Sequence, residues 1–241
     1  LIYLSKAGWA RKIVTRWSIA WKAASRFIAG EKLEDAIRVI QGLNAAGIAA
    51  TLDHLGENTT NIQEAQTATQ DILKIFDAID NAHVQANVSI KLTQIGLSLD
   101  EDLCVENLRK ILSYAKEKNN FVRIDMEDSS YVETTLRLYY KMRQEFGFNN
   151  TGLVLQAYLY RSQADLSKVA ENAGRVRLCK GAYKDPPDVA FPKKKDVDAN
   201  YDVLAEMLVD AAIAHGAQEV SPDGKTPPIP AIASHDPLRI E

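Results

Sequence analysis

Short apolar runs alternate with amphipathic stretches along most of the chain. Six runs have the aliphatic, β-branched character of buried strands, and stretches of about 10–20 residues with helical periodicity separate them. The six runs are "IAATLDHLGE", "ANVSIKLTQIG", "FVRIDMED", "GLVLQAYLYR", "RVRLCKGAY" and "PAIASHD". Strands that alternate with helices in this way predict parallel βαβ units in one sheet.

Helices are predicted between these runs and ahead of them. They span about 3–28, 31–46, 60–79, 101–118, 131–146, 162–172 and 198–215. The stretches 184–197 and "SPDGKTPPIP" are rich in proline and charge, so we expect exposed loops there. Because no glycine-rich linker divides the strands, we expect a helical segment over 1–46 and a single catalytic domain of the α/β class over 47–241.

Composition narrows the class of protein. Of the 241 residues, 46% are hydrophobic and 25% are charged, as in ordinary soluble globular proteins. The net charge of −3 predicts no nucleic-acid partner. Cys104 and Cys179 are too few for a disulfide framework, which favours a reducing, cytoplasmic location. No apolar run approaches the ~18 residues that are needed to span a membrane.

Charge is distributed unevenly along the chain. Residues 1–30 hold six basic side chains, no acid and all three tryptophans, whereas the remainder holds 23 basic and 32 acidic residues. A basic, Trp-rich helix can lie on an anionic membrane, which would make the protein peripheral at the inner face of that membrane. It can equally pack its aromatic side on the acidic remainder. Both interpretations stay open.

Polar side chains collect where the predicted strands end. Because side chains alternate along a strand, Asp125 and Glu127 lie on the face opposite to Ile124. The full set is Asp53, His54, Glu57, Lys91, Asp125, Glu127, Gln156, Arg177, Lys180, His235 and Asp236. Buried parallel strands are otherwise almost wholly apolar, so six strands that end alike predict one shared pocket at the C-terminal face of the sheet.

The residue types in this set limit the chemistry. A phosphate-binding loop and a Rossmann fingerprint are both absent from the sequence. The four histidines form no H-x-H or H-E-x-x-H motif, so no metal site is predicted. Lys91 could form a Schiff base, as in aldolases. Alternatively, Lys91 and Arg177 could hold an anionic substrate or cofactor, with Asp125 pairing with Lys91 and organising both. The residues alone do not choose between these two.

Seven stretches resemble the proline dehydrogenase family, especially its monofunctional bacterial members. They are "LDHLGE", "NVSIKLTQIGL", "VRIDMED", "VLQAYLYR", "VRLCKGAYK", "VDANY" and "ASHD", in the order of the family, from about residue 27 to the end of the chain. The resemblance implies a (βα)₈ TIM-type barrel preceded by N-terminal helices. It also implies non-covalently bound FAD, oxidation of L-proline to Δ1-pyrroline-5-carboxylate in proline catabolism, and electron delivery to a membrane quinone.

The resemblance also implies roles for individual residues. Lys91 should bind the proline carboxylate, Asp125 should hold Lys91, and Arg177 should lie beside the flavin, which makes Asp125 and Arg177 the expected catalytic pair. Glu57 matches the acid of an ion-pair gate over the proline pocket. The residues expected to line FAD are Met126, Gln156, Arg177, Lys180, Gly181, Ala182, Ser234 and His235, and Ala182 and Tyr183 should also wall the proline pocket.

Two features depart from the family pattern. Cys179 replaces the more usual valine. The last two barrel strands, and with them the paired arginines that clamp the proline carboxylate in the family, have no counterpart in this sequence. We therefore expect the native gene to continue past Glu241 for roughly 60 or more residues, at ~30 residues for each βα unit. An inactive barrel fragment is the alternative to a working enzyme.

Overall fold

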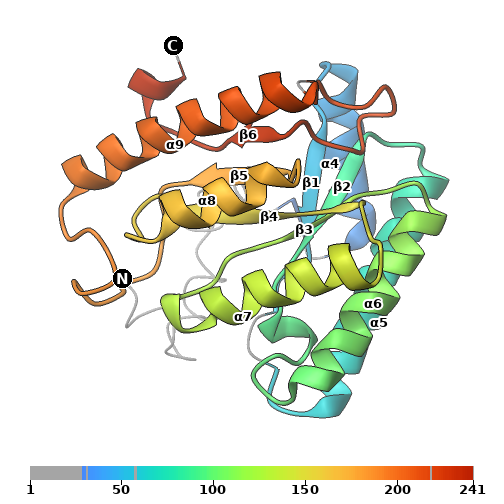
Figure 1. Cartoon of the computed structure of the whole chain (residues 1–241). Helices are drawn as coiled ribbons and strands as arrows, with labels where there is room; N and C mark the ends of the chain where they lie inside the picture. The colour runs from blue at the N-terminus through green and yellow to red at the C-terminus, as the bar shows by residue number, and fades with distance from the viewer. Residues whose placement is uncertain (1–28, 31, 57–58, 218, 241) are drawn as a thin grey trace, which may run out of the picture.

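The computed structural model describes residues 29–30, 32–56, 59–217 and 219–240. A parallel sheet of six strands, in the order β1–β2–β3–β4–β5–β6, forms its centre (Figure 1). The strands are β1 (Ala50–Asp53), β2 (Ala86–Ile90), β3 (Val122–Ile124), β4 (Thr151–Gln156), β5 (Val176–Cys179) and β6 (Pro230–Ile232). Each of the six predicted runs therefore contains one strand, and neighbours in the chain are neighbours in the sheet.

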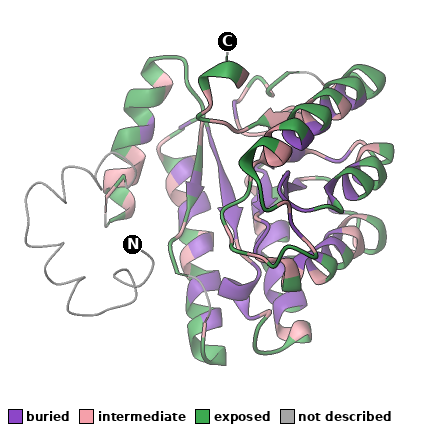
Figure 2. Cartoon of the chain, turned by 90° about the vertical axis from the view of Figure 1, so that its left-hand side faces the viewer, coloured by how far each residue is buried: buried purple, intermediate pink, exposed green. Residues whose placement is uncertain are grey.

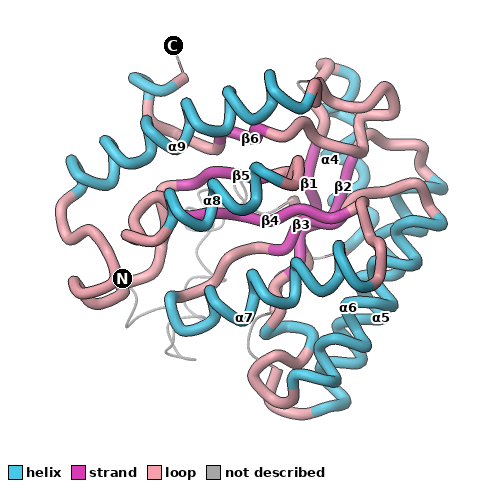
Figure 3. The backbone as a smooth tube through the Cα atoms, viewed as in Figure 1, coloured by secondary structure: helices cyan, strands magenta, loops and turns pink. Residues whose placement is uncertain are grey.

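Helices connect consecutive strands, as the alternating pattern predicted. The connecting helices are α5 (Ile62–Asn81), α6 (Glu101–Glu117), α7 (Ser129–Tyr140), α8 (Ser162–Glu171) and α9 (Lys194–His215), and α4 (Leu33–Ala45) precedes β1. Short helical turns are η1 (Thr93–Ile95), η2 (Lys141–Glu145) and η3 (Pro237–Arg239). The helix expected over 3–28, and with it the Trp-rich segment, lies outside the described residues. The tube in Figure 3 shows long loops after β5 and after α9.

One predicted boundary is wrong. We expected a loop over 184–197, but α9 begins at Lys194. Lys194 Nζ donates to Asp198 Oδ2 at 2.5 Å, an i,i+4 pair that supports the first turn of the helix. The many prolines and lysines in this stretch therefore predicted the loop correctly but not the residue at which it ends.

The core lies between the curled sheet and the helices outside it. All residues of β2 and β4 are buried, and Figure 2 shows burial along the strands and on the helix faces that pack against them. α9 packs against β5 and β6 in the same way. Burial on both faces explains why these strands are nearly continuous apolar runs in the sequence.

Asparagine and aspartate side chains start three of the helices. The Asn61 carboxamide accepts from the Glu64 backbone N–H at 3.0 Å at the start of α5, and Asp100 accepts from Leu103 at 2.8 Å at the start of α6. Asp128, the last residue of "FVRIDMED", accepts from the Ser130 N–H at 3.0 Å and caps α7. Each cap fixes the residue at which the helix begins. The loops between strand and helix end there, and their residues lie at the C-terminal edge of the sheet.

The register brings Asp125 and Arg177 to the same level of the sheet. Ser89 is paired with Arg123, Ile124 with Leu153, and Val154 with Arg177, so Asp125, one residue past Ile124, is level with Arg177. The sheet confirms the α/β class and the six parallel strands. The closed eight-stranded barrel that the family resemblance implies stays a prediction. No helix among the described residues is long and apolar enough to cross a membrane.

Candidate active site

An arginine–aspartate pair occupies the middle of the C-terminal edge. Arg177 on β5 donates from Nη2 to Asp125 Oδ1, just past β3, at 2.5 Å. The pair reaches across β4, and Asp125 also accepts from Ser89 Oγ on β2 at 3.1 Å. Only 26% of the Arg177 side chain and 16% of the Asp125 side chain are exposed. Three strands thus meet in one charge-assisted contact, which is strong when partly shielded from water.

Lys91 follows β2 at the same edge, but it does not pair as we predicted. Its ammonium lies 3.4 Å from Asp53 Oδ2 at the end of β1, and only 15% of its side chain is exposed. The expected pairing of Lys91 with Asp125 is therefore wrong for this structure. Asp125 instead contacts the planar guanidinium of Arg177, and a guanidinium suits a carboxylate better than a point charge does.

The three acids of "FVRIDMED" have three different partners. Asp125 contacts Arg177, Asp128 caps α7, and Glu127 accepts two hydrogen bonds from Thr93. Glu127 is 5% exposed, so its carboxylate is held inside the protein rather than in solvent. The three carboxylates thus take part in three separate contacts, and that of Asp125 joins Arg177, a cation of the predicted site.

Arg123, two residues before Asp125 and on the same face of the strand, is a buried cation. It is 2% exposed and donates to the backbone oxygen of Leu153 at 3.3 Å. Burial, and secondarily the neighbouring charge of Arg177, lowers the pKa of Arg123 to about 9. The guanidinium remains protonated at neutral pH, so a second positive charge lies beneath the edge, near Asp125 and Arg177.

The end of β4 presents an unsatisfied acceptor. Gln156 is 3% exposed, and its Nε2 donates to the backbone oxygen of Met126 at 3.2 Å. Its Oε1 is buried without a hydrogen-bond partner among the described residues. Buried acceptors are nearly always paired, so we expect a bound group to donate a hydrogen bond to this atom. Met126 itself is 4% exposed.

The loop after β5 is strapped to two neighbouring elements. Asp185 accepts from the Ser129 backbone N–H at 3.1 Å, from Ser129 Oγ at 2.7 Å, and from the Tyr158 hydroxyl in a short hydrogen bond. Burial, and then the bond to Asp185, raises the pKa of Tyr158. This strap fixes the segment in which Ala182 is exposed and Tyr183 is half-buried.

Gly181 can only be a glycine in this loop. Its φ is +109°, and a Cβ atom would lie 2.1 Å from Cδ1 of Tyr158. We expect Gly181→Ala to destabilise the protein by ~1–3 kcal/mol, because the loop must move off Tyr158, and to lower its cofactor content. Thermal unfolding and cofactor absorbance would measure both. Gly147→Ala is the matched control, since its φ is +70° and a Cβ there meets nothing within 4 Å. Equal losses in both variants would contradict the role of the Tyr158 contact.

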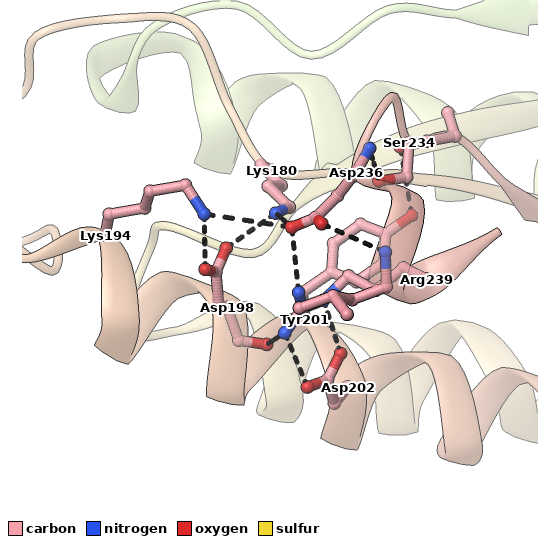
Figure 4. Close-up of polar contacts among 10 residues, drawn as sticks. Lys180, Lys194, Asp198, Tyr201, Asp202, Ser234, Asp236 and Arg239 are labelled. Carbon is pink, nitrogen blue, oxygen red and sulfur yellow. Dashed lines mark hydrogen bonds and ion pairs between the residues drawn. The ribbon is translucent and has the colours of Figure 1, made fainter. Parts of the chain in front are cut away.

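Lys180 lies in an ionic network rather than at an open surface. Its ammonium donates to Asp198 Oδ1 and to Asp236 Oδ2, each at 2.6 Å (Figure 4). Asp236 also accepts from Arg239 at 2.8 Å, and its own N–H donates to Ser234 Oγ at 3.0 Å. The network joins β5, α9 and the segment after β6. Ser234 is therefore tied to Lys180 through Asp236, and the adjacent His235 is exposed.

This network predicts a pH effect on stability. Hydrogen bonds from Lys180 and then from Lys194 lower the pKa of Asp198 from 3.8 to about 2. A carboxyl whose pKa is lowered by folding stabilises the protein above its unfolded pKa, and that contribution is lost as pH falls through the folded value. We expect Asp198→Asn to lower the Tm at pH 6 and to remove part of its acid-induced fall between pH 4 and about 2. Asp188→Asn is the control, because that carboxylate makes no bond within the described part of the chain. A parallel Tm profile for Asp198→Asn and wild type would contradict this assignment.

Several of the predicted site residues meet at one edge. Lys91, Asp125 and Lys180 directly follow their strands and Gln156 ends β4, whereas Arg177 is the second residue of β5 and joins the group through its contact with Asp125. Glu57 lies outside the described residues. Sequence reasoning did not assign a role at the site to Asp53, Glu127, Asp185 or Asp198. Asp198 had a signal, since it belongs to the quoted stretch "VDANY", whereas Asp185 lies in a loop without periodicity.

Comparison with known proteins assigns the sequence to a group of relatives. A family model described as "Proline dehydrogenase" matches residues 36–238. Proline dehydrogenase 1 of Bacillus subtilis (strain 168) is 40% identical over 199 residues, which cover 81% of this chain and 65% of that protein. The proline dehydrogenase of Deinococcus radiodurans is 41% identical over 184 residues, covering 75% of this chain and 59% of the relative. The chain thus spans less than two thirds of the length of these relatives.

Solved structures agree on the fold. Proline utilization A from Bdellovibrio bacteriovorus superposes with a TM-score of 0.72 at 24% identity, over 80% of this chain and 25% of that one. The Bradyrhizobium japonicum protein of the same name gives a TM-score of 0.70 at 20% identity, over 96% of this chain and 27% of that one. At these identities the likeness concerns the fold alone.

Proposed function

The chain belongs to the proline dehydrogenase family, and on that premise we propose that it catalyses the FAD-dependent oxidation of L-proline to Δ1-pyrroline-5-carboxylate and passes the electrons to a membrane quinone. The observation that carries the proposal is the Arg177–Asp125 pair, with Lys91 beside it, at the C-terminal edge of the sheet. Chemistry in parallel α/β folds belongs at this edge.

The residues at this edge fit a flavin. Gln156 Oε1 is a buried acceptor without a donor, and an N–H of the isoalloxazine ring would satisfy it. Arg177 and the buried Arg123 supply positive charge, which stabilises a reduced, anionic flavin. Gly181 brings backbone without a side chain to the end of β5. Met126, Lys180, Ala182, Ser234 and His235 are the further residues that we propose to line FAD.

Bound FAD would supply the hydride acceptor, and the chain would position the substrate. We assign Lys91 to the proline carboxylate, since a small zwitterion offers that group as its best handle. The Lys91 ammonium lies 3.4 Å from Asp53 Oδ2, at the C-terminal edge of the sheet where we propose that the substrate carboxylate binds. Asp125 holds the Arg177 guanidinium in one orientation. Ala182 and Tyr183 would wall the pocket, and Glu57 would gate it.

An absorption spectrum tests the proposal directly. Purified protein should show flavin bands, and L-proline added without oxygen should bleach them. A colourless protein, or flavin bands that L-proline leaves unchanged, would contradict it. Borohydride trapping of a carbonyl compound on Lys91 would instead support Schiff-base chemistry. The membrane contact that we propose for residues 1–30 is testable by flotation of the protein with anionic vesicles.

A further inference from the structure

We propose that Glu127 is a positioning residue for Lys91 and that it acts through Thr93. This inference rests on the proposed function, because it explains how the lysine assigned to the substrate carboxylate is held in place. Glu127 belongs to the loop after β3, and Thr93 stands two residues after Lys91 at the start of η1.

Both oxygens of the Glu127 carboxylate are used on one residue. Oε1 accepts from the Thr93 backbone N–H at 3.1 Å, and Oε2 accepts from Thr93 Oγ1 at 2.5 Å. Thr93 is fully buried, and Glu127 is 5% exposed. A buried carboxylate is costly unless it is hydrogen-bonded, and the first N–H groups of a helical turn have no partner within the turn. The contact satisfies both needs and fixes the backbone and the side chain of Thr93 together.

The same turn is held from its other side by α6. Asn107 Nδ2 donates to the Ile95 backbone oxygen at 3.0 Å, and the Gln94 N–H donates to the backbone oxygen of Lys91 at 3.2 Å. The turn that follows Lys91 is therefore hydrogen-bonded to α6 on one side and to the loop after β3 on the other. A lysine side chain is long and flexible, so the position of its backbone decides where its ammonium can reach.

The contact also relates Lys91 to the next strand. Met126 precedes Glu127, and its backbone oxygen accepts from Gln156 Nε2 on β4 at 3.2 Å. A displaced loop after β3 would therefore move Lys91 relative to Gln156, the residue with the unsatisfied acceptor. Small displacements at a reacting centre are expensive in rate and affinity.

Two matched threonine variants separate positioning from general stability. Thr93→Val keeps the β-branched shape and removes the hydroxyl that Glu127 accepts from. Thr69→Val makes the same change at a 1% exposed threonine on α5, whose hydroxyl donates to the Ala65 backbone oxygen at 2.8 Å. We expect Thr93→Val to raise the KM for L-proline about tenfold with kcat changed far less. Thr69→Val should leave KM unchanged, and Thr93→Ser, which keeps the hydroxyl, should restore it.

A readout without turnover separates this inference from the proposed function. After reductive ¹³C-dimethylation, the NMR signal of Lys91, assigned with Lys91→Met, should move in Thr93→Val and stay in place in Thr69→Val. If the wild type shows no reduction by L-proline, the proposed function fails while the NMR result still decides the positioning. An unmoved Lys91 signal, or equal KM values in the two valine variants of an active protein, would overturn the inference.

Discussion

Replacing Arg177 by methionine is expected to slow the reduction of the flavin by L-proline about 100- to 1,000-fold, the usual cost of removing one preorganised hydrogen-bond donor from an active site. Arg177 is the cation in contact with Asp125, and its loss leaves a carboxylate that is 16% exposed without its guanidinium. The flavin reduction potential should fall as well, because a positive charge favours the reduced form. Stopped-flow reduction and a potential titration measure the two effects.

Arg175→Met is the control for this experiment. Arg175 immediately precedes β5, two residues before Arg177, and its Nε donates to the Pro227 backbone oxygen at 2.7 Å instead of to a carboxylate of the site. We expect its loss to cost stability without moving the potential. Arg177→Lys keeps the positive charge but loses the planar donor group. We therefore expect its flavin reduction potential to stay near the wild-type value while the rate of flavin reduction falls. Wild-type rate and potential in Arg177→Met would place Arg177 away from the flavin.

Replacing Lys91 by methionine is expected to raise the KM for L-proline about 10- to 100-fold while flavin stays bound. A hydrogen bond to a charged group typically contributes ~1.5–3 kcal/mol, and each 1.4 kcal/mol is about tenfold in affinity. Methionine keeps much of the length and packing of the side chain and removes the charge. Asp53 would then lose an ion-pair partner at the end of β1, so Tm should be measured beside KM.

Lys118→Met provides the matched comparison. Lys118 is also largely shielded, with 27% of its side chain exposed, and it pairs with Asp77 at 3.1 Å and Asp80 at 3.2 Å away from the edge. Its loss should change Tm but not KM. An unchanged KM in Lys91→Met, or an equal rise in Lys118→Met, would exclude Lys91 as the carboxylate ligand.

The sequence by itself determined the six strands and their parallel direction. Continuous apolar runs form strands that are buried on both faces, and alternating helices allow only parallel connections. It also placed Lys91, Asp125 and Gln156 at one edge, because each follows or ends such a run, whereas Arg177 lies inside β5. These properties depend on local periodicity and on chain direction, which the order of residues contains directly.

Only the tertiary structure decided which charges pair. Periodicity gives the face of each side chain but not its reach across a curled sheet, and Arg177 spans β4 to contact Asp125 while Lys91 lies beside Asp53. Lys180 likewise pairs with Asp198 and Asp236, which are 18 and 56 residues away. The partner of a flexible charged side chain depends on which opposite charge the packed backbone brings closest, and that distance exists only in the folded chain.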